Sequence, residues 1–281
     1  MFGMELKITT LSENTAGLGS FLGEWGLSIL FETEDLSLLL DTGQSVSASY
    51  NADLLGVDLS RISRIVLSHG HFDHTGGLPY LLRKMGKEIE IIAHPAVWAD
   101  KYSNREGQPC RYIGIPYQHS ELESLGARFK LSEKPVRISD RIMTTGEIPM
   151  VTEFEKIEPY LLVKDGGSLQ PDELLDDQAL IITTEVGLVV ILGCAHRGVI
   201  NTLYHAQQLT GVTEIHTVLG GCHLMDASNE RIRLTVAALK DMGVGKLGVS
   251  HCTGLPAACL MSREFGDRFF FNNAGTIISL P

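Results

Sequence analysis

Six consecutive residues, His69-Gly70-His71-Phe72-Asp73-His74, place three imidazoles and one carboxylate in a single short stretch of the chain. Neutral imidazole nitrogens and carboxylate oxygens are ligands for borderline metal ions such as Zn²⁺ or Fe²⁺. A single histidine is more often a hydrogen-bonded residue of a loop or a core. Packing does not need three histidines and an aspartate in one turn, so the cluster predicts a metal site.

Three more histidines each follow an apolar run that has the composition of a buried strand. His196 comes after residues 188–192, His223 after residues 215–219 and His251 after residues 246–250. At a strand end the sheet fixes the backbone, while the loop that follows leaves side chains free to bind. We therefore expect His196 and His251 to be further metal ligands, and His223 to bind metal or to lie beside it. The alternative for each is a loop histidine that hydrogen-bonds a neighbour.

Asp41 ends another apolar run near the expected site. Its carboxylate would accept an N–H from a ligand histidine and fix the tautomer of that ring. The alternative is that it only caps the turn at Thr42-Gly43. His94 precedes a proline and is expected to have a supporting or structural role. The remaining histidines are interpreted as ordinary residues: His119 in a loop, His205 in a helix and His216 at the start of a strand.

The hydrophobic pattern around the cluster predicts the elements that must position it. Residues 64–68 form a β-branched apolar run directly before it, and a helix-like run, Leu78 to Met85, follows. Ser45 or Ser47 could cap the first helix, whereas Ser228 and Gly243 would bound a later one. Further strands are expected at 6–11, 27–33, 36–40, 88–93, 127–131, 136–138, 141–145, 179–184, 188–192, 215–219 and 246–250, and further helices at 47–55, 199–209, 228–242 and 256–265.

Two segments lack a clear period. Residues 101–120 are rich in turn residues and tyrosines, and residues 164–177 are rich in Gly, Pro and Asp. Long stretches of this kind in compact proteins are often functional, so both are predicted to be ordered loops near the site. The chain has no long linker and no low-complexity run. A single domain over residues 1–281 is therefore expected.

The composition restricts the kind of partner. The net charge of −11 argues against general affinity for nucleic acid, although a small anionic ligand could still bind at a local metal pair. Met1 to Thr10 has no apolar core of a signal peptide, and no apolar stretch is long enough to span a membrane. The odd count of five cysteines, without a secretory signal, indicates free thiols in a reducing compartment and a cytoplasmic location. The cysteines contain no CxxC pair, so a structural zinc ribbon is not expected. Homo-oligomerisation is left open.

The order of the chemical residues resembles that of the metallo-β-lactamase superfamily. The resemblance begins with Asp41, the cluster at 69–74, His196 and His251, and it extends over nearly the whole chain. Further motifs are similar to the branch of metal-dependent hydrolases named for 7,8-dihydropterin-6-methyl-4-(β-D-ribofuranosyl)aminobenzene 5′-phosphate synthase. These motifs are Ile113-Gly114-Ile115-Pro116, Thr145-Gly146-Glu147-Ile148-Pro149, Asp176-Asp177-Gln178-Ala179-Leu180, Gly193-Cys194-Ala195-His196, Gly220-Gly221-Cys222-His223-Leu224 and His251-Cys252-Thr253-Gly254.

The resemblance implies an α/β fold, a four-layer αββα sandwich with a metal pair at one edge between the two sheets. The implied cofactors are two divalent metal ions, zinc first and iron or manganese as alternatives. Cys194 stands where many members carry an aspartate that bridges the metals. The resemblance therefore leaves two alternatives: Cys194 bridges the metals as a thiolate, or no residue bridges them. Met150 stands where relatives often carry an arginine, which removes one anion contact. The implied ligands are His69, His71 and His196 for the first ion and Asp73, His74 and His251 for the second.

The resemblance further implies a metal-dependent hydrolase or transferase acting on a small anionic, phosphorylated substrate. A metal-activated water would hydrolyse a phosphate, diphosphate or ester. In the synthase version, the metals would bind the diphosphate of a dihydropterin-methyl diphosphate while an aromatic amine displaces it. Asp73 would also orient the water, and His223 and Cys222 are candidates for a proton relay or a substrate contact. The alternatives are a phosphodiesterase, lactonase or thioesterase on the same scaffold, or a non-catalytic metal- or ligand-binding protein.

Aromatic and basic residues near the first loop segment could contact a planar, charged substrate. The rings could instead simply pack the loop onto the body, and the basic residues could be solvated surface. The aromatic candidates are Tyr102, Tyr112, Tyr117 and Phe154, and the basic candidates are Lys101, Arg105 and Arg111.

Overall fold

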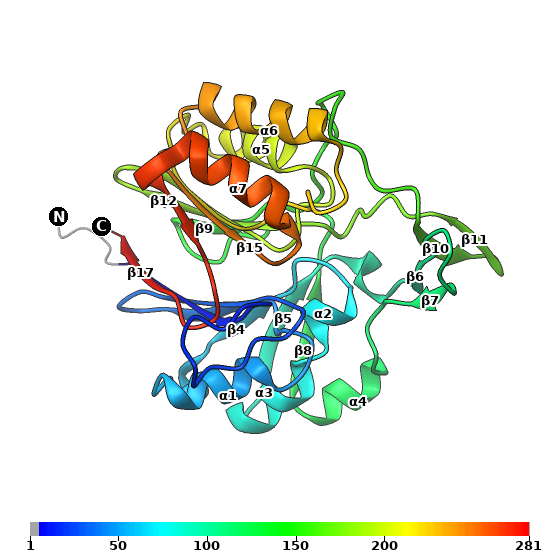
Figure 1. Ribbon diagram of the computed structural model, residues 1–281. Helices are drawn as coiled ribbons and strands as arrows, with labels where there is room; N and C mark the ends of the chain where they lie inside the picture. Colours follow the sequence, from blue (N-terminus) through cyan, green and yellow to red (C-terminus); the bar gives the residue numbers. More distant parts are fainter. Residues whose placement is uncertain (1–5, 281) are drawn as a thin grey trace.

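The computed structural model describes residues 6–280, so the expectation for residues 1–5 lies outside the described part. Two β-sheets lie face to face, and helices cover the outer face of each (Figure 1). The predicted four-layer αββα sandwich is therefore confirmed. Within residues 6–280, no helix combines the length and the apolar character that a membrane crossing requires.

The first sheet has seven strands in the order β17-β1-β2-β3-β4-β5-β8. The strands from β3 to β8 run parallel, whereas β17, β1, β2 and β3 pair antiparallel. Helices α1 (Ser47–Leu54), α3 (Leu78–Met85) and α4 (His119–Ser124) cover its outer face, in the lower half of Figure 1. The strands are β1 (Leu6–Ser12), β2 (Ser28–Glu32), β3 (Ser37–Leu40), β4 (Arg64–Val66), β5 (Ile89–Ala93), β8 (Ala127–Leu131) and β17 (Ile277–Leu280).

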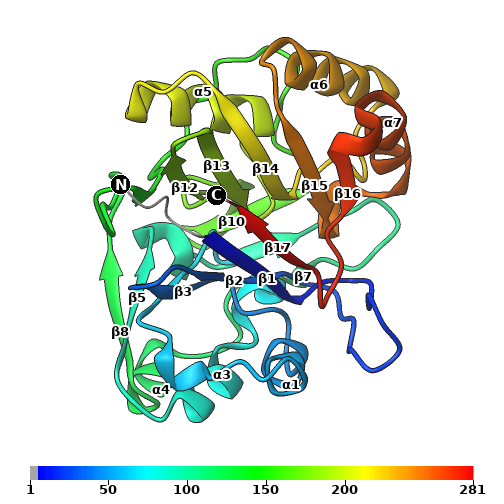
Figure 2. The ribbon, with the colours of Figure 1, turned by 90° about the vertical axis from the view of Figure 1, so that its left-hand side faces the viewer.

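The second sheet has six strands in the order β16-β15-β14-β13-β12-β9. The strands from β13 to β16 are parallel, and β9, β12 and β13 pair antiparallel. Helices α5 (Val199–Thr210), α6 (Asn229–Asp241) and α7 (Leu255–Phe265) cover it (Figure 2). The strands are β9 (Ile142–Thr144), β12 (Ala179–Thr184), β13 (Gly187–Leu192), β14 (Ile215–Gly221), β15 (Lys246–Ser250) and β16 (Phe269–Phe271).

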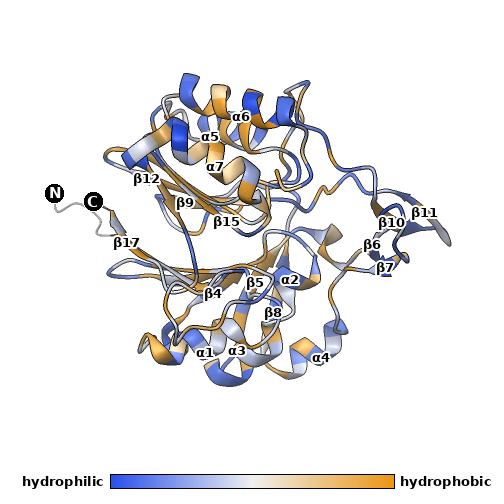
Figure 3. Ribbon diagram, in the orientation of Figure 1, coloured by the Kyte–Doolittle hydropathy of each residue, from blue (hydrophilic) through white to orange (hydrophobic). Residues whose placement is uncertain are grey.

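Both sheets bury their two faces, and this explains the continuous apolar runs in the sequence. Along β3, Leu38 and Leu40 point into the core between the sheets, whereas Leu39 packs under the helices. Along β13, Val189 lies between the sheets and Val190 lies on the helix side. The hydropathy colouring shows mainly hydrophobic strands between the helices of the two halves, for example near the labels of β4 and β15 (Figure 3).

A third, small sheet corrects the prediction of two loops. Residues within 101–120 and 164–177 contribute to a four-stranded antiparallel sheet, with order β11-β10-β6-β7, at one end of the sandwich (Figure 1). Its strands are short and mostly half-buried or exposed, so the sequence carries no period that would reveal them. They are β6 (Lys101–Ser103), β7 (Arg111–Tyr112), β10 (Leu161–Asp165) and β11 (Ser168–Pro171).

Smaller differences concern element ends. No strand forms at 136–138, where Arg137 makes only an isolated bridge with Met143. Neither predicted serine caps α1, because the Ser47 hydroxyl bonds the carboxylate of Glu24 instead. Ser228 does cap α6 as predicted. His119, expected in a loop, is the first residue of α4.

Candidate metal centre

The histidine cluster lies at the carboxyl end of β4 and continues into a one-turn helix, α2 (Phe72–Thr75). His69 and His74 are fully buried, and His71 is nearly so. The turn brings the ring centroids of His69 and His71 within 4.5 Å, and those of His69 and His74 within 4.3 Å. His69 Nε2 lies 3.0 Å from His71 Nδ1. The local backbone therefore gathers the predicted ligands from one segment of the first sheet.

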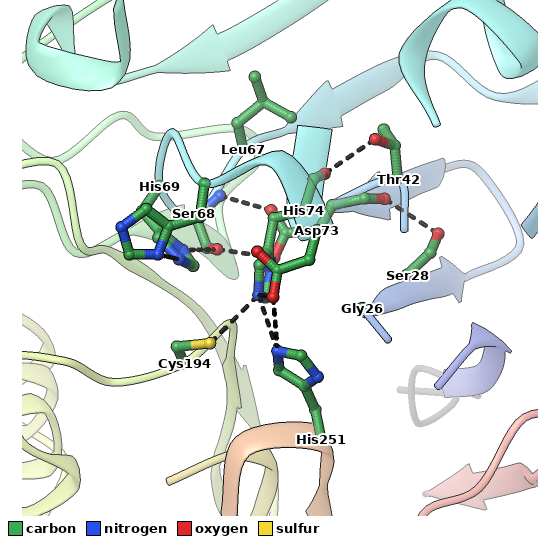
Figure 4. Close-up of polar contacts among 12 residues, drawn as sticks. Gly26, Ser28, Thr42, Leu67, Ser68, His69, Asp73, His74, Cys194 and His251 are labelled. Atoms are coloured by element: carbon green, nitrogen blue, oxygen red, sulfur yellow. Dashed lines mark hydrogen bonds and ion pairs between the residues drawn. The ribbon is translucent and has the colours of Figure 1, made fainter. Parts of the chain in front are cut away.

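The second sheet supplies the opposing groups from the ends of β13 and β15. Cys194 Sγ lies 3.1 Å from His74 Nε2, and His251 Nε2 lies 3.3 Å from the same atom (Figure 4). His196 Nε2 lies 3.3 Å from His69 Nε2. Residues that are more than 100 positions apart in the sequence thus meet at one edge of the sandwich.

These side chains form two adjacent donor groups that share one sulfur atom. His69, Cys194 and His196 make one group, and His74, Cys194 and His251 make the other. Within each group, one ligand atom of every residue lies within 4.8 Å of the others. Asp73 Oδ2 adds a carboxylate oxygen 3.2 Å from His251 Nε2. The arrangement provides nitrogen, sulfur and oxygen donors for one or two metal ions.

The chemistry of these donors fits a borderline metal ion. Burial holds the pKa values of His69, His71 and His196 well below their usual range, so all three rings are neutral at neutral pH and keep a lone pair for a metal. Two buried ring nitrogens, His71 Nε2 and His196 Nδ1, have no hydrogen-bond partner in the described part of the chain. Such atoms are costly unless something else satisfies them.

Asp41 orients two of the histidines, and the contact expected of it is present. Its carboxylate oxygen lies 2.7 Å from His74 Nδ1 and also accepts from the Ser68 hydroxyl at 2.6 Å. The Ser68 hydroxyl lies in turn 2.9 Å from His69 Nδ1. Burial alone would lower the pKa of His74, but the charge and hydrogen bond of Asp41 outweigh it and raise that pKa to about 9. A Cβ at Gly193 would lie 2.0 Å from Ser68 Oγ, so only glycine fits behind this pair.

His251 is held by residues that the sequence analysis missed. Its backbone N–H donates to Glu13 Oε1 at 2.6 Å, and its Nδ1 lies 2.8 Å from Asn14 Oδ1. Both partners follow directly after β1, and a polar pair at the end of an apolar strand is the signal that could have indicated them. The ring of Trp25 packs on His251 with centroids 4.9 Å apart.

Lys101 is neither solvated nor available to a phosphate, contrary to both interpretations of its sequence. Its side chain is 1% exposed, and its Nζ lies 2.8 Å from Asp172 and 2.9 Å from Asp176. The other oxygen of Asp176 accepts the backbone N–H of Gly70 at 2.7 Å. This buried ion pair therefore links the small sheet to the loop that carries His69 and His71.

The backbone around the centre is strained. Asp41, Ala195, His223 and His251 all have positive φ angles, between 44° and 59°, which non-glycine residues rarely adopt. Each such residue costs on the order of 1 kcal/mol and persists only where the surroundings enforce it. The strain therefore lies at four strand ends around the centre, those of β3, β13, β14 and β15.

The two residues proposed for a proton relay, His223 and Cys222, have different surroundings in the structure. His223 lines the cleft above the centre, stacks on His196 at 4.0 Å and lies 3.2 Å from Glu158. Cys222 instead packs in the core between the second sheet and its helices, where burial raises the pKa of its thiol to about 12. Cys222 is not among the cleft-lining residues, so its predicted catalytic role lacks support.

Of the two interpretations of the aromatic residues near the first loop segment, packing is the one that the structure supports. Trp25, Phe72 and Tyr160 line the described part of the cleft, together with Arg105 and Arg111, around about 550 Å³ of empty space that opens to solvent. None of the four predicted rings lines it. Tyr102 and Tyr112 pack edge to face on each other, Tyr117 donates to the Gly76 carbonyl, and Phe154 packs against the second-sheet core.

The supporting histidines stay outside the donor groups. His94 Nε2 lies 3.1 Å from Glu147 Oε1, and its Nδ1 accepts the Ala96 N–H, which agrees with the structural role expected for it. His205 lies in α5 and His216 near the start of β14, as expected, and neither belongs to a described donor group.

Comparison with known proteins agrees with this geometry. Residues 26–199 match the family described as the metallo-beta-lactamase superfamily. The 7,8-dihydropterin-6-methyl-4-(beta-D-ribofuranosyl)-aminobenzene-5'-phosphate synthase of Methanocaldococcus jannaschii is 36% identical over 97% of this chain and 96% of its own. A solved metal-dependent hydrolase of the beta-lactamase superfamily has a TM-score of 0.84 at 29% identity, covering 98% of this chain and 99% of the other. Zn²⁺-bound PqqB from Methylobacterium extorquens shares the fold alone, with a TM-score of 0.60 at 12% identity and coverage of 98% and 100%.

Proposed function

The chain belongs to the metallo-beta-lactamase superfamily, and from this premise we propose that it is a two-metal enzyme acting on a small phosphorylated aromatic substrate. The observation that carries the proposal is the pair of donor groups that share Cys194. These groups lie beneath a cleft that has aromatic rings and arginines in its walls. An open dinuclear site in such a cleft is suited to catalysis on an anion.

Different residues of the chain would bind each metal and orient its ligands. Two bound divalent ions would neutralise charge on phosphate oxygens and lower the pKa of a bound water. Asp41, by accepting from Nδ1 of His74, leaves Nε2 of that ring free to bind. The first ion would be held by His69, His71 and His196 and the second by Asp73, His74 and His251. Cys194 belongs to both donor groups.

Displacement of diphosphate is the reaction that we favour, because the 36% identical relative is a synthase of an aminobenzene phosphate compound. The nitrogen of an aromatic amine would bond to the methylene carbon of a pterin-methyl diphosphate. The carbon–oxygen bond to diphosphate would break, diphosphate would leave, and the nitrogen would lose a proton. His223 lines the cleft, where its ring would contact the leaving diphosphate.

Hydrolysis is the second candidate, and it is favoured by the likeness to a metal-dependent hydrolase at a TM-score of 0.84. The same side chains would then act on a substrate that water attacks instead of an amine. The two reactions differ only in the nucleophile that enters the cleft. A fold does not choose between them.

The test supplies a pterin-methyl diphosphate to the metal-loaded protein, with and without an aromatic amine, and measures released diphosphate. Release that requires the amine supports transfer, and release without it supports hydrolysis. His71→Ala and His251→Ala should abolish either reaction, whereas His119→Ala, on the exposed helix α4, should leave it intact. No release from this substrate or from aryl phosphodiesters by metal-loaded protein would contradict the proposal.

A further inference from the structure

The wall of the cleft is cationic in a protein that is otherwise acidic. The chain carries a net charge of −11. Arg105 and Arg111 nevertheless line the cleft, and Asp73 is the one carboxylate among its described lining residues. Because Asp73 lies against His251 in the metal centre, the outer wall presents positive charge to an incoming ligand. A local field of this kind favours an anion.

The two arginines differ in what they already bind. The Arg105 guanidinium lies 2.7 Å from Asp226 and stacks over the Tyr160 ring at 4.1 Å. Arg111 has neither an ion pair nor a side-chain hydrogen bond with any residue between 6 and 280, and its guanidinium lies 5.8 Å above the Phe72 ring. A guanidinium with unused donors can bind a phosphate through two parallel hydrogen bonds.

Backbone hydrogen bonds hold Arg111 in a set position relative to the metal loop. Arg111 lies on β7, and two residues further on the carbonyl of Ile113 accepts the N–H of Phe72 at 2.9 Å. Ile113 N–H donates in turn to the carbonyl of Lys101, whose side chain is fixed by Asp176. Phe72 stands between His71 and Asp73 in the chain. The sheet therefore fixes the backbone of Arg111 relative to the metal loop, and the exposed side chain extends from there to the Phe72 ring.

We propose that Arg111 selects substrates that carry a second anionic group, a phosphate monoester on an aromatic ring, away from the bond that reacts. The ring would lie against Phe72, and the phosphate would bind the guanidinium of Arg111. Arg105 would remain engaged with Asp226 and Tyr160 as part of the wall. The inference rests on the proposed function, since it assigns the far end of the same substrate.

Two substrates that share a reacting bond can test this. One is benzyl p-nitrophenyl phosphate, and the other is the same diester with a phosphate monoester at the para position of the benzyl ring. Wild-type protein should show the lower KM for the phosphorylated diester. Arg111→Gln should raise that KM about tenfold, as expected for the loss of a charged hydrogen bond at a partly solvated site. The KM of the plain diester and both kcat values should not change.

Matched variants separate recognition from general charge. Arg263→Gln, on the exposed face of α7 beside Glu264, removes the same charge outside the cleft and should alter neither KM. Arg111→Lys should restore only part of the loss, because an ammonium keeps the charge without the planar fork. An equal rise in KM for both diesters in Arg111→Gln would overturn the inference.

A binding measurement tests the role of Arg111 even if the protein does not cleave the diesters. Trp25 lines the cleft, whereas Trp98 packs with His119 and Phe129, so Trp98→Phe leaves Trp25 as the reporter. Quenching of Trp25 by 4-(hydroxymethyl)phenyl phosphate should weaken about tenfold in Arg111→Gln. If neither diester is cleaved, a weakened titration still supports the role of Arg111, and an unchanged titration overturns it.

Discussion

Asp41 has the widest effect of any single residue at the centre. Its carboxylate accepts hydrogen bonds from the Ser68 backbone N–H and hydroxyl and contacts His74 Nδ1. The Ser68 hydroxyl in turn contacts His69 Nδ1, so Asp41 also restrains His69 indirectly. Outer partners of this kind set the tautomer and the direction of metal-binding rings. One carboxylate therefore orients a ligand in each donor group.

Replacing Asp41 should weaken metal binding without removing a ligand. Asp41→Asn keeps the shape but loses the charge that favours N–H at Nδ1 of His74. We expect a loss of about 10- to 100-fold in metal affinity, measured by competition with a chromophoric chelator. Asp53→Asn, an exposed aspartate of α1 that pairs with Lys84, is the matched control. Equal affinities for the two variants would contradict the role assigned to Asp41.

Cys194 belongs to both donor groups, so its loss should affect both metal positions. Cys194→Ala should lower the metal content below that of the parent protein, and in cobalt-substituted protein it should remove the sulfur-to-metal charge-transfer absorption. Elemental analysis and near-ultraviolet spectra give the two readings. Cys259→Ala, on the exposed side of α7, should change neither. A charge-transfer band of unchanged intensity in Cys194→Ala would contradict metal binding by this sulfur, and Cys194→Ala/Cys252→Ala tests whether Cys252 gives any residual band.

At the scale of elements, the sequence predicts what periodicity and burial dictate. Long apolar runs such as β12 and β13 were predicted within a residue of their bounds, because both of their faces are buried. The small sheet was predicted as loops, since β6 and β7 have three and two residues and make no periodic pattern. Strand β6 forms only because it pairs with β10, which lies about 60 residues away in the sequence.

The same reasoning explains which parts of the site were predictable. The cluster at 69–74 and the strand-end histidines are local signals, and the structure brings them together. Glu13, Asn14 and Asp176 were not assigned. A polar pair does mark the end of β1, but only the fold shows the contacts with His251 and Gly70, which span more than 100 residues. Lys101 was misjudged for the same reason, since only the fold shows the carboxylates that allow its burial.

The buried pairing of Lys101 should matter for stability because it links two elements. Lys101→Met would leave Asp172 and Asp176 without their partner inside the protein. Breaking a buried ion pair in this way costs about 3–5 kcal/mol. Urea unfolding should show that loss, whereas Lys164→Met, an exposed lysine of β10, should change stability by less than about 0.5 kcal/mol. Equal stability of the two variants would show that the pair does not hold the small sheet.

The buried carboxyl of Glu155, at the start of α5, should make the stability of the protein depend on pH. Burial raises the pKa of its carboxyl, although the N–H groups of Ile200 and Asn201 oppose this. The folded protein therefore binds this proton more tightly than the unfolded chain. The contribution to stability is complete below pH 4.5, the usual pKa, and is lost as pH rises through the raised folded pKa.

The expected result is a difference curve. The free energy of unfolding of the wild type, minus that of Glu155→Gln, should fall as pH increases from about 4.5. Urea unfolding across this pH range gives the curve. Glu153→Gln, an exposed neighbour, should give a flat difference. A curve for Glu155→Gln that rises with pH would mean that the helix start lowers this pKa.

At the scale of the whole molecule, the two sheets bring their strand ends to one edge. The first sheet supplies the histidine cluster and Asp41, and the second supplies Cys194, His196 and His251. Figure 4 shows His74 of the first sheet facing Cys194 and His251 of the second. The small sheet then adds an arginine wall above them. Each of the two donor groups that share Cys194 combines a histidine of the first sheet with residues of the second, so both form only when the sandwich is assembled.

The central claim is that this edge holds two metal ions. The most direct test is elemental mass spectrometry of protein purified without added metal, with the metal expressed per chain. We predict close to two equivalents of zinc, iron or manganese, falling in His71→Ala and His251→Ala. A single equivalent that cannot be raised by titration would contradict a pair. No metal, with none taken up on titration, would contradict the metal centre itself.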